Sequence, residues 1–463
     1  MNTKQIRQKI LDLAILGELV PQDPTDEPAS VLLERIRAEK EQLIKDKKLK
    51  RDKTDNEPIE EIPFELPEGW VWCRLGEIGI WGSGVTPSRN KKEYYDGNIP
   101  WLKTGDLNDS YIYETSELIS DLAVKEYSLK MIPIGSILIA MYGATIAKLG
   151  LLEIEVTTNQ ACCTCTPFSG IVNKFLFHYL FSQKQNIKNK AEGGAQPNIS
   201  KEKLINFLFP LPPLTEQHRI VEKVEQLFAL VDTIEQLQEE LKALIKQTRN
   251  QVLNYAIAGK LTHQDPNDEP AEELLKRIGK TTAPDTPYEK LPKGWAWCQG
   301  NQILNTMKSQ KPSGEKFNYI DIASIDNRQN KITEVKTIAV TDAPSRASRK
   351  VKFGDTLFSM VRPYLKNIAF VDEEYSNCIA STGFYVCSPN EALFPKYLFY
   401  LMVSDYVVQG LNKHMKGDNS PSINNEDITN FIFPLAPLAE QYRIVEKIES
   451  FFASFNQIEK ELA

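Results

Sequence analysis

Part of the sequence occurs twice, in an order that strongly constrains how the chain can fold. Residues 11–36 align with residues 253–278, with 16 of 26 positions identical, and residues 197–235 align with residues 421–459, with 22 of 39 identical. The second alignment pairs FPLPPLTEQHRIVEK with FPLAPLAEQYRIVEK. Internal repetition of this kind predicts two copies of one structural unit.

A third match divides each copy into a repeated framework and an enclosed module. LPEGWVWC begins at Leu66, and LPKGWAWC begins at Leu291. From these starts to the FP motifs run two stretches of 145 and 144 residues, 66–210 and 291–434, whose interiors barely resemble each other. We call them modules 1 and 2, and the remainder the framework. Drift after duplication would blur the framework as much as the modules, so the pattern favours two modules that do one kind of job on two targets.

Composition and charge limit the class of protein. The chain has 463 residues, about three times the ~150 residues typical of one domain. Its 41% hydrophobic and 25% charged residues exclude wholesale disorder, a collagen-like repeat and a membrane-embedded chain. The net charge is −7, but module 1 has 14 basic and 14 acidic residues and module 2 has 16 and 14. The acidity therefore lies in the framework, and the chain is not a generic, strongly basic phosphate-coating protein.

A long amphipathic helix is predicted in the middle of the chain. From Glu216 onward, apolar residues recur mostly at spacings of three and four, which is typical of a coiled-coil seam. The 43 residues from Glu216 to Ala258 would span about 65 Å, and Gly259 marks the expected end. The predicted seam consists of Ile220, Val224, Leu227, Val231, Ile234, Leu237, Leu241, Leu244, Val252 and Tyr255.

The two ends of the chain carry the two halves of the same pattern. The C-terminal copy, residues 444–462, repeats the first half of the seam, and residues 6–13 match its second half. If the paired termini pack antiparallel to the central helix, the chain becomes a closed pseudo-two-fold object with one module at each end.

Short strand-like runs dominate both modules. They are residues 136–142 and 154–165 in module 1, and residues 356–361 and 379–387 in module 2. Each module also has a short aromatic helix, residues 173–183 and 395–403, and a late loop rich in Gly, Pro and Asn, residues 193–200 and 417–424. The expected fold class is α+β: two globular, sheet-rich α/β modules separated by long antiparallel coiled-coil helices in a circular pseudo-two-fold arrangement.

The sequence offers no convincing catalytic, cofactor or metal site. Gly279-Lys280-Thr281 resembles the end of a phosphate loop, but the glycine required five residues earlier is Leu274. No Asn-Pro-Pro-aromatic motif is present, the four histidines are scattered, and Cys162, Cys163 and Cys165 lack a second ligand pair. We therefore expect a non-catalytic binding protein with no cofactor or metal on this chain. Seven cysteines and no apolar N-terminal signal indicate the cytoplasm.

The TEQxRIVEK-type helix after Phe-Pro-Leu-x-Pro-Leu, the LPxGWxW module starts and the circular repeat together resemble the specificity subunit of Type I restriction-modification systems. The resemblance covers nearly the whole chain. It implies that the modules are target recognition domains, each reading one half of a split, asymmetric sequence in double-stranded DNA, with the helices as a spacer. The implied segments are residues 1–45 (N-terminal helical segment), 46–65 (charged linker), 66–210 (target recognition domain 1), 211–262 (central long helix), 263–290 (linker that repeats the N-terminal segment), 291–434 (target recognition domain 2) and 435–463 (C-terminal helix).

The resemblance also implies partners. Two methyltransferase subunits would dock on the helices and recruit motor-nuclease subunits, and S-adenosylmethionine and ATP with Mg²⁺ would bind to those partners. Phosphate affinity supplied by partners would leave this chain to supply the base contacts that carry sequence information, which explains its near-neutral modules.

Candidate DNA-contacting residues are chosen by their chemical type and their place in turns or at strand ends. In module 1 they are Arg89, Asn90, Lys91, Lys92, Lys103, Thr104, Tyr142, Gln160, Gln196 and Asn198. In module 2 they are Arg328, Arg346, Arg349, Lys350, Arg362, Tyr364, Thr382 and Asn419. Each taken alone is also compatible with an ordinary solvated side chain. The tryptophans of both module starts occupy matching positions, which favours core packing over stacking on bases.

Two other functions remain open at this point. The chain could be a structural adaptor whose two modules bind protein partners, which its acidic balance would favour. It could also be an enzyme with an unrecognised site. Specific retention of a split duplex by an assembled complex would exclude the adaptor, and activity of the isolated chain would indicate the enzyme.

Overall fold

The computed structural model describes residues 2–51, 59, 61–192, 197–283 and 290–462. The chain divides into two compact units, Asn2–Leu237 and Gln238–Ala463 together with Met1, which we call the N-terminal and C-terminal units. The boundary falls within helix α7 (Leu214–Ile257), so each unit contains one module and one half of this helix.

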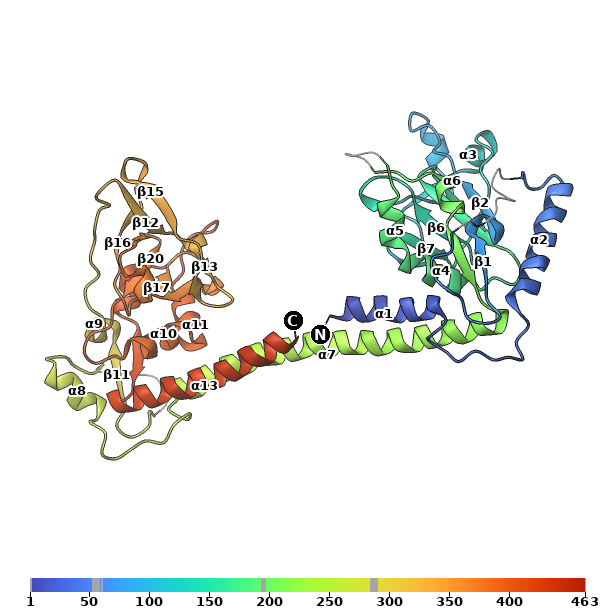
Figure 1. Cartoon of the computed structure of the whole chain (residues 1–463). Coiled ribbons are helices and arrows are strands. Elements are labelled where there is room, and N and C mark those ends of the chain that lie inside the picture. Colours follow the sequence, from blue (N-terminus) through green and yellow to red (C-terminus); the bar gives the residue numbers. More distant parts are fainter. Residues whose placement is uncertain (1, 52–58, 60, 193–196, 284–289, 463) are drawn as a thin grey trace. The chain divides into compact units, whose positions relative to one another are not determined.

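The framework of the N-terminal unit consists of helices α1 (Thr3–Leu16) and α2 (Ala29–Lys45) and the first half of α7. The Asn2 side chain accepts a hydrogen bond from the Gln5 N–H and so begins α1. Gly17 ends it with φ of +73°, and a Cβ there would lie 2.5 Å from Cγ of Pro67. Figure 1 shows α1 alongside the first half of α7.

Module 1 combines three sheets with short helices. The sheet orders are β1-β10, β2-β9-β6-β7-β4 and β5-β3-β8. The strands are β1 (Val71–Arg74), β2 (Gly79–Ser83), β3 (Ile99–Leu102), β4 (Ser110–Ile112), β5 (Glu117–Ile119), β6 (Ile137–Ala140), β7 (Leu149–Leu152), β8 (Thr157–Thr158), β9 (Cys162–Pro167) and β10 (Leu208–Leu211). The helices and 3₁₀ turns are α3 (Asp121–Glu126), α4 (Asn173–Ser182), α5 (Lys184–Asn189), α6 (Lys201–Ile205), η1 (Leu75–Glu77), η2 (Lys92–Tyr95) and η3 (Gly143–Thr145).

The C-terminal unit is built on the same plan. Its sheet orders are β11-β21, β15-β12-β19-β16, β13-β14 and β18-β17-β20. The strands are β11 (Ala296–Gln299), β12 (Lys316–Ile320), β13 (Ile325–Asp326), β14 (Lys331–Ile332), β15 (Lys336–Ala339), β16 (Ala347–Lys350), β17 (Thr356–Ser359), β18 (Ile368–Phe370), β19 (Ile379–Ser381), β20 (Phe384–Cys387) and β21 (Ile432–Leu435). The helices and 3₁₀ turns are α8 (Ala271–Arg277), α9 (Gly300–Ile303), α10 (Pro395–Val403), α11 (Asp405–Asn412), α12 (Asn425–Thr429), α13 (Leu438–Leu462), η4 (Ile322–Ser324), η5 (Val340–Asp342), η6 (Pro363–Leu365) and η7 (Glu373–Tyr375).

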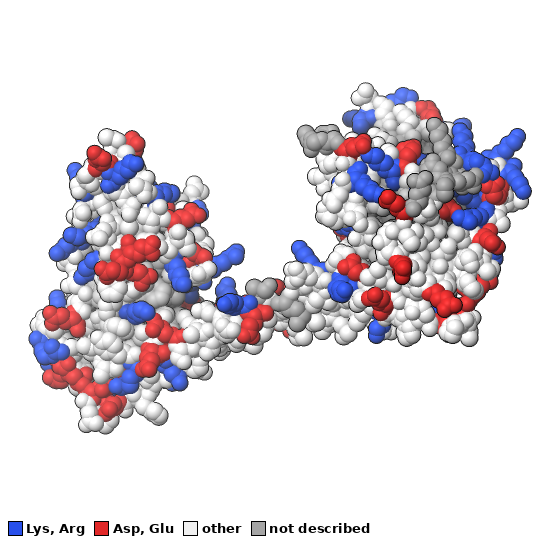
Figure 2. Space-filling model, in the orientation of Figure 1, with Lys and Arg blue, Asp and Glu red and all other residues white. Residues whose placement is uncertain are grey.

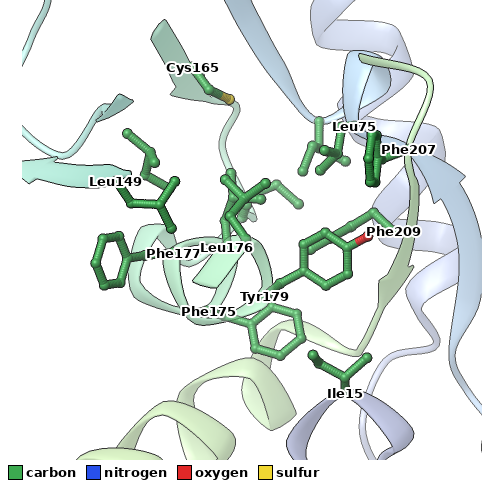
Figure 3. Packing of buried hydrophobic residues seen from close by; sticks show 14 of the residues in the cluster. Ile15, Leu75, Leu149, Cys165, Phe175, Leu176, Phe177, Tyr179, Phe207 and Phe209 are labelled. Atoms are coloured by element: carbon green, nitrogen blue, oxygen red, sulfur yellow. The ribbon is translucent and has the colours of Figure 1, made fainter. Parts of the chain in front are cut away.

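The largest core cluster of the N-terminal unit joins its module to its framework. Phe175 and Tyr179 of α4 pack against Phe209 of β10, and Ile15 of α1 lies in the same cluster (Figure 3). Trp70 and its repeat counterpart Trp295 are each 8% exposed, so these two module-start tryptophans are core residues as predicted. Burial of such large side chains fixes each module against its own framework helices.

The predicted long helix is confirmed, but its seam is partly wrong from Leu237 onward. Ile220, Val224, Val231 and Val252 are buried as predicted. In contrast, the side chains of Leu237, Leu244 and Tyr255 are more than half exposed. Besides Val252, the buried positions of the second half are Ile245, Leu253, Ala256 and Ile257, which the predicted seam does not contain. The buried stripe moves because the first half of α7 packs with α1 and the second half lies along α13 (Figure 1).

The antiparallel pairing with the ends of the chain is visible as ion pairs within each unit. Arg7 of α1 contacts Asp232 at 2.5 Å and Glu235 at 3.1 Å on the first half of α7. Arg249 on the second half of α7 contacts Glu459 of α13 at 3.0 Å. The fold class predicted from the repeats is therefore found: sheet-rich α/β modules with long framework helices, including one that runs between them.

Candidate nucleic-acid interface

A polar cluster repeated in both units fixes each module to its framework. In the N-terminal unit, Nε1 of Trp70 donates to the buried carboxylate of Glu216 at 2.9 Å, and Arg219 pairs with Asp26 at 2.6 Å. In the C-terminal unit, Trp295 donates to Glu440 at 2.8 Å, and Arg443 pairs with Asp268 at 2.6 Å. The repeated framework sequence therefore forms the same contact between module and framework in both units, and the two modules start at equivalent positions.

A second repeated contact joins the aromatic helix of each module to the coiled coil. His178 of α4 packs edge-to-face on Phe228 of α7, with ring centroids 5.7 Å apart. At the equivalent place Tyr400 of α10 packs on Phe452 of α13, with centroids 5.8 Å apart. His178 is 8% exposed, its Nε2 makes no hydrogen bond to a described residue, and burial lowers its pKa to about 4.

Because His178 is buried, we expect the stability of the N-terminal unit to decrease in acid. Because the pKa of His178 is lower in the folded state than its ordinary value of 6.5, the unfolded state binds the proton first. The free energy of unfolding should therefore fall by about 3 kcal/mol as the pH drops from 6.5 towards 4. His178→Tyr, which copies Tyr400, should reduce that fall when urea unfolding is compared at pH 7 and pH 4.5. An equal fall in both proteins would show that His178 does not cause the loss of stability in acid.

In module 1 the structure brings two predicted residues together. Tyr142 lies in the loop after β6, and its side chain is nearly half exposed. Its backbone forms an antiparallel bridge with Asn198 of the Gly/Pro/Asn loop. The Gly143 N–H donates to the Pro197 carbonyl at 2.9 Å. Glu192 and Asn198 exchange two backbone hydrogen bonds. Gln196 was also predicted, and it lies outside the described residues.

Module 2 brings Arg362, Tyr364 and Asn419 together in the same way. The loop after β17 begins at Arg362, whose N–H donates to the Pro421 carbonyl at 2.8 Å. Its guanidinium donates to the Asn419 carbonyl at 2.8 Å, and Tyr364 on η6 is nearly half exposed. Lys416 and Ser422 exchange two backbone hydrogen bonds.

The two loops share positive φ at two equivalent positions but differ in side chains. Each has two residues with positive φ around a 3₁₀ turn: Gly143 and Ala147 around η3, and Arg362 and Lys366 around η6. A positive φ is unfavourable for arginine, and such strain is typically kept where function requires it. We call the strand-end loop, together with the backbone pair that lies beside it (Glu192–Asn198 or Lys416–Ser422), the loop frame of each module.

The other predicted residues of module 1 lie in an ionic cluster or on exposed turns. Arg89 pairs with Glu117 at 2.7 Å and lies over the ring of Tyr95, and Lys103 pairs with the same Glu117. Lys91 contacts the hydroxyl of Tyr94 at 2.8 Å. Asn90 and Lys92 are exposed, Thr104 is half-buried, and Gln160 is exposed and accepts a hydrogen bond from Thr86.

The other predicted residues of module 2 lie on one turn and one strand. Arg328 is exposed on a turn that touches the loop frame, because Asn327 donates to the Leu365 carbonyl at 3.0 Å. Arg349 and Lys350 belong to β16, and Arg346 directly precedes it. The Thr382 N–H donates to the Arg346 carbonyl at 2.8 Å, which places that threonine beside the same strand.

Sequence reasoning missed a polar hollow in module 2. Its volume is about 300 Å³, and it is lined by side chains able to bond base edges as well as by two apolar ones. The lining residues are Gln310, Ser313, Lys316, Phe317, Asn318, Thr337, Asn377 and Ile379. Asn318 and Thr337 are cross-strand neighbours of β12 and β15, a pairing that a single sequence does not reveal.

The described cysteines and histidines offer no metal site. Cys162, Cys163 and Cys165 lie buried in β9, and burial raises the pKa of each thiol. No group of three His, Cys, Asp or Glu side chains among the described residues could hold a metal ion. Figure 2 shows basic and acidic side chains interspersed on the visible face of each unit. None of the helices in the described part of the chain is both long and apolar enough to cross a bilayer.

Comparison with known families and proteins gives a consistent result. A family model described as the Type I restriction modification DNA specificity domain matches residues 67–243 and 299–463. The specificity subunit of the Type I restriction enzyme EcoAI of Escherichia coli is 27% identical, covering 98% of this chain and 90% of the relative. The EcoEI specificity subunit of the same species is 26% identical, covering 99% of this chain and 90% of the relative.

Solved structures share the fold. The HsdS subunit from Thermoanaerobacter tengcongensis matches with a TM-score of 0.58 and 21% identity, over 88% of this chain and 94% of that one. A chain from a study of complex assembly and conformational transition of the type I R-M system matches with a TM-score of 0.59 and 20% identity, over 86% and 94%.

Proposed function

Because the chain belongs to the family of Type I restriction-modification specificity subunits, we propose that it reads a bipartite, asymmetric target in double-stranded DNA and carries no catalytic site of its own. Each module is a target recognition domain, residues 66–210 and 291–434, and reads one half-site. The chain directs partner methyltransferase and restriction subunits to that target.

The loop frames are the observation that carries this proposal. Both modules keep positive φ at two equivalent positions and equivalent backbone hydrogen bonds, but their side chains differ, so that Gly143 stands where Arg362 does. A recognition element that must read different bases needs a constant support and variable side chains. The candidate base contacts from the loop frames are Tyr142, Asn198, Arg362, Tyr364 and Asn419.

The framework helices are proposed as spacer and docking surface. In the N-terminal unit, Leu230 and Leu237 of α7 lie seven residues apart and are more than half exposed. A heptad spacing of exposed leucines suits a partner helix, which we assign to a methyltransferase subunit. S-adenosylmethionine and ATP with Mg²⁺ are expected on the partner subunits rather than on this chain.

Exchange of a module tests the proposal. If residues 291–434 are replaced by the corresponding module of a relative, one half of the methylated sequence in the host genome should change and the other half should stay. The reciprocal exchange of residues 66–210 should change the opposite half. An unchanged methylated sequence would contradict the assignment of reading to the exchanged module.

A binding measurement separates this function from a structural adaptor. The complex with methyltransferase subunits should retain a duplex carrying the mapped methylated sequence and release a scrambled duplex of the same composition. Equal retention of both duplexes would favour the adaptor.

A further inference from the structure

Module 2 contains a strand, β16, that has no counterpart among the described strands of module 1, where the isolated bridge between Ile132 and Val156 lies next to β8. In module 1, the Gly84 and Val85 N–H groups donate directly to the carbonyls of Asn159 and Thr158, next to β8. Strand β19 matches β8, because each lies parallel to the corresponding strand β12 or β3. In module 2, however, β16 lies between β19 and the segment that corresponds to residues 84–85. It pairs antiparallel with β19 and, at Arg349, with Ser309.

This additional strand brings together two segments that are rich in basic residues. Residues 308–311 and 346–350 lie side by side, since the Gln310 N–H donates to the Ser348 carbonyl at 2.9 Å and the Lys350 N–H donates to the Lys308 carbonyl at 3.1 Å. We call these two segments the basic ribbon. Its nine residues include five bases and no acid, and the bases are Lys308, Lys311, Arg346, Arg349 and Lys350.

The charges of the basic ribbon are not neutralised within the described part of the chain. None of its five basic side chains makes an ion pair or a side-chain hydrogen bond to a described residue. Four of them are exposed, and the fifth, Arg349, is half-buried with its Nε atom lacking a partner. Unpaired bases in adjacent segments create a local positive potential despite the net charge of −7.

Three of the four bases selected in module 1 are in a different state, and the fourth, Lys92, is exposed. Arg89 and Lys103 both pair with Glu117, and Lys91 lies 3.6 Å from Glu126. They are held by carboxylates of their own module, so an anion would have to compete for them. The basic ribbon has no such competitor, and Gln310 also belongs to the polar hollow, so the ribbon borders groups able to bond base edges.

We propose that the basic ribbon binds the phosphate backbone of DNA beside the half-site read by module 2, and that this module supplies a larger share of the salt-dependent affinity than module 1. The inference rests on the proposed function and adds an asymmetry to it. Phosphate contacts set the register of a protein on the duplex, whereas base contacts set its sequence preference. The ribbon therefore acts on affinity for every sequence, and the loop frames act on discrimination.

The test uses the assembled complex with its methyltransferase subunits and two duplexes, one carrying the mapped methylated sequence and one scrambled. Affinity is measured between 50 and 200 mM salt for the triple variant Lys308→Gln, Lys311→Gln, Lys350→Gln. Each lost phosphate contact lowers the slope of log affinity against log salt by about 0.9, so the triple variant should lose about 2.7. Affinity for both duplexes should fall by the same factor, and their ratio should stay constant.

A matched control removes three exposed lysines of the same unit that lie outside the ribbon: Lys260→Gln, Lys290→Gln, Lys293→Gln. It makes the same change in net charge and should leave the slope within about one of the parent value. Equal slopes for the parent and the triple variant, with the parent still preferring its target, would overturn the ribbon while leaving the proposed function intact. The proposal would also be overturned if the triple variant had the same unfolding temperature as the parent but no longer assembled into the complex. That result would indicate an acidic protein surface as the partner of the basic ribbon. If the parent did not discriminate between the duplexes, the proposed function itself would fail.

Discussion

Replacement of Gln441 by leucine should destabilise the C-terminal unit by about 3 kcal/mol or more, with no comparable effect on the N-terminal unit. Gln441 is fully buried, and its Oε1 accepts a hydrogen bond from the Phe394 N–H at 2.8 Å. Its Nε2 donates to the carbonyls of Ala392 and Ala436, both at 2.9 Å. Leucine has a similar size but would leave one buried N–H and two carbonyls without these partners, which is the costly way to remove a hydrogen bond.

Gln217 provides the matched variant. It is also fully buried, accepts from the Val172 N–H at 2.8 Å, and donates to the carbonyls of Gly170 and Pro212, both at 3.2 Å. Gln217→Leu should therefore destabilise the N-terminal unit. Hydrogen exchange resolved by peptide measures the two units separately, because each variant should raise exchange in its own unit. A single substitution that raised hydrogen exchange equally in both units would contradict the assignment of a separate contact between module and framework to each unit.

Replacement of Arg362 by glycine should leave stability nearly unchanged while it weakens recognition of the DNA target. Glycine accepts the positive φ of this position without strain, which offsets the lost hydrogen bond to the Asn419 carbonyl. The free energy of unfolding should change by no more than about 1 kcal/mol. If the guanidinium reads a base, affinity for the mapped target should fall by about 1–3 kcal/mol, roughly 5- to 150-fold.

The measurement is the affinity of the assembled complex for the target and for a scrambled duplex. Arg362→Gly should reduce the ratio of the two affinities, whereas the triple variant of the basic ribbon should leave that ratio constant. The reciprocal Gly143→Arg is a useful comparison, since a Cβ there would meet no atom within 4 Å and its strain at positive φ is the same kind that Arg362 already carries. An unchanged ratio in Arg362→Gly would remove this residue from the set of base contacts.

Repetition and periodicity predicted the framework well. The helix expected over residues 216–258 is α7, Leu214–Ile257, because thirty or more residues of regular apolar spacing leave few alternatives. The seam failed at Leu237 and Leu244, where the buried face of the helix depends on which partner lies beside it. Residues 379–387 read as one strand but form β19 and β20 in two different sheets, because the choice of pairing partner is a long-range property.

For the candidate site, the sequence identified single residues but not their relations. Tyr142 and Asn198, and Arg362 and Asn419, were selected separately as turn residues, and their contacts emerge only from the fold. The sequence also could not show that Glu117 neutralises Arg89 and Lys103, because these residues lie far apart along the chain. The lining of the polar hollow was missed for the same reason, since amides are common on solvated strands.

The buried thiols have a practical consequence for measuring this molecule. All seven cysteines are buried and free, and burial raises the pKa of each thiol. Such thiols remain protonated and react slowly with alkylating reagents. A cysteine introduced on the surface of each unit would therefore take up a fluorescent or spin label selectively, with no need to remove any native sulfur. Distances between the labels would then report how the molecule changes when it binds its ligand.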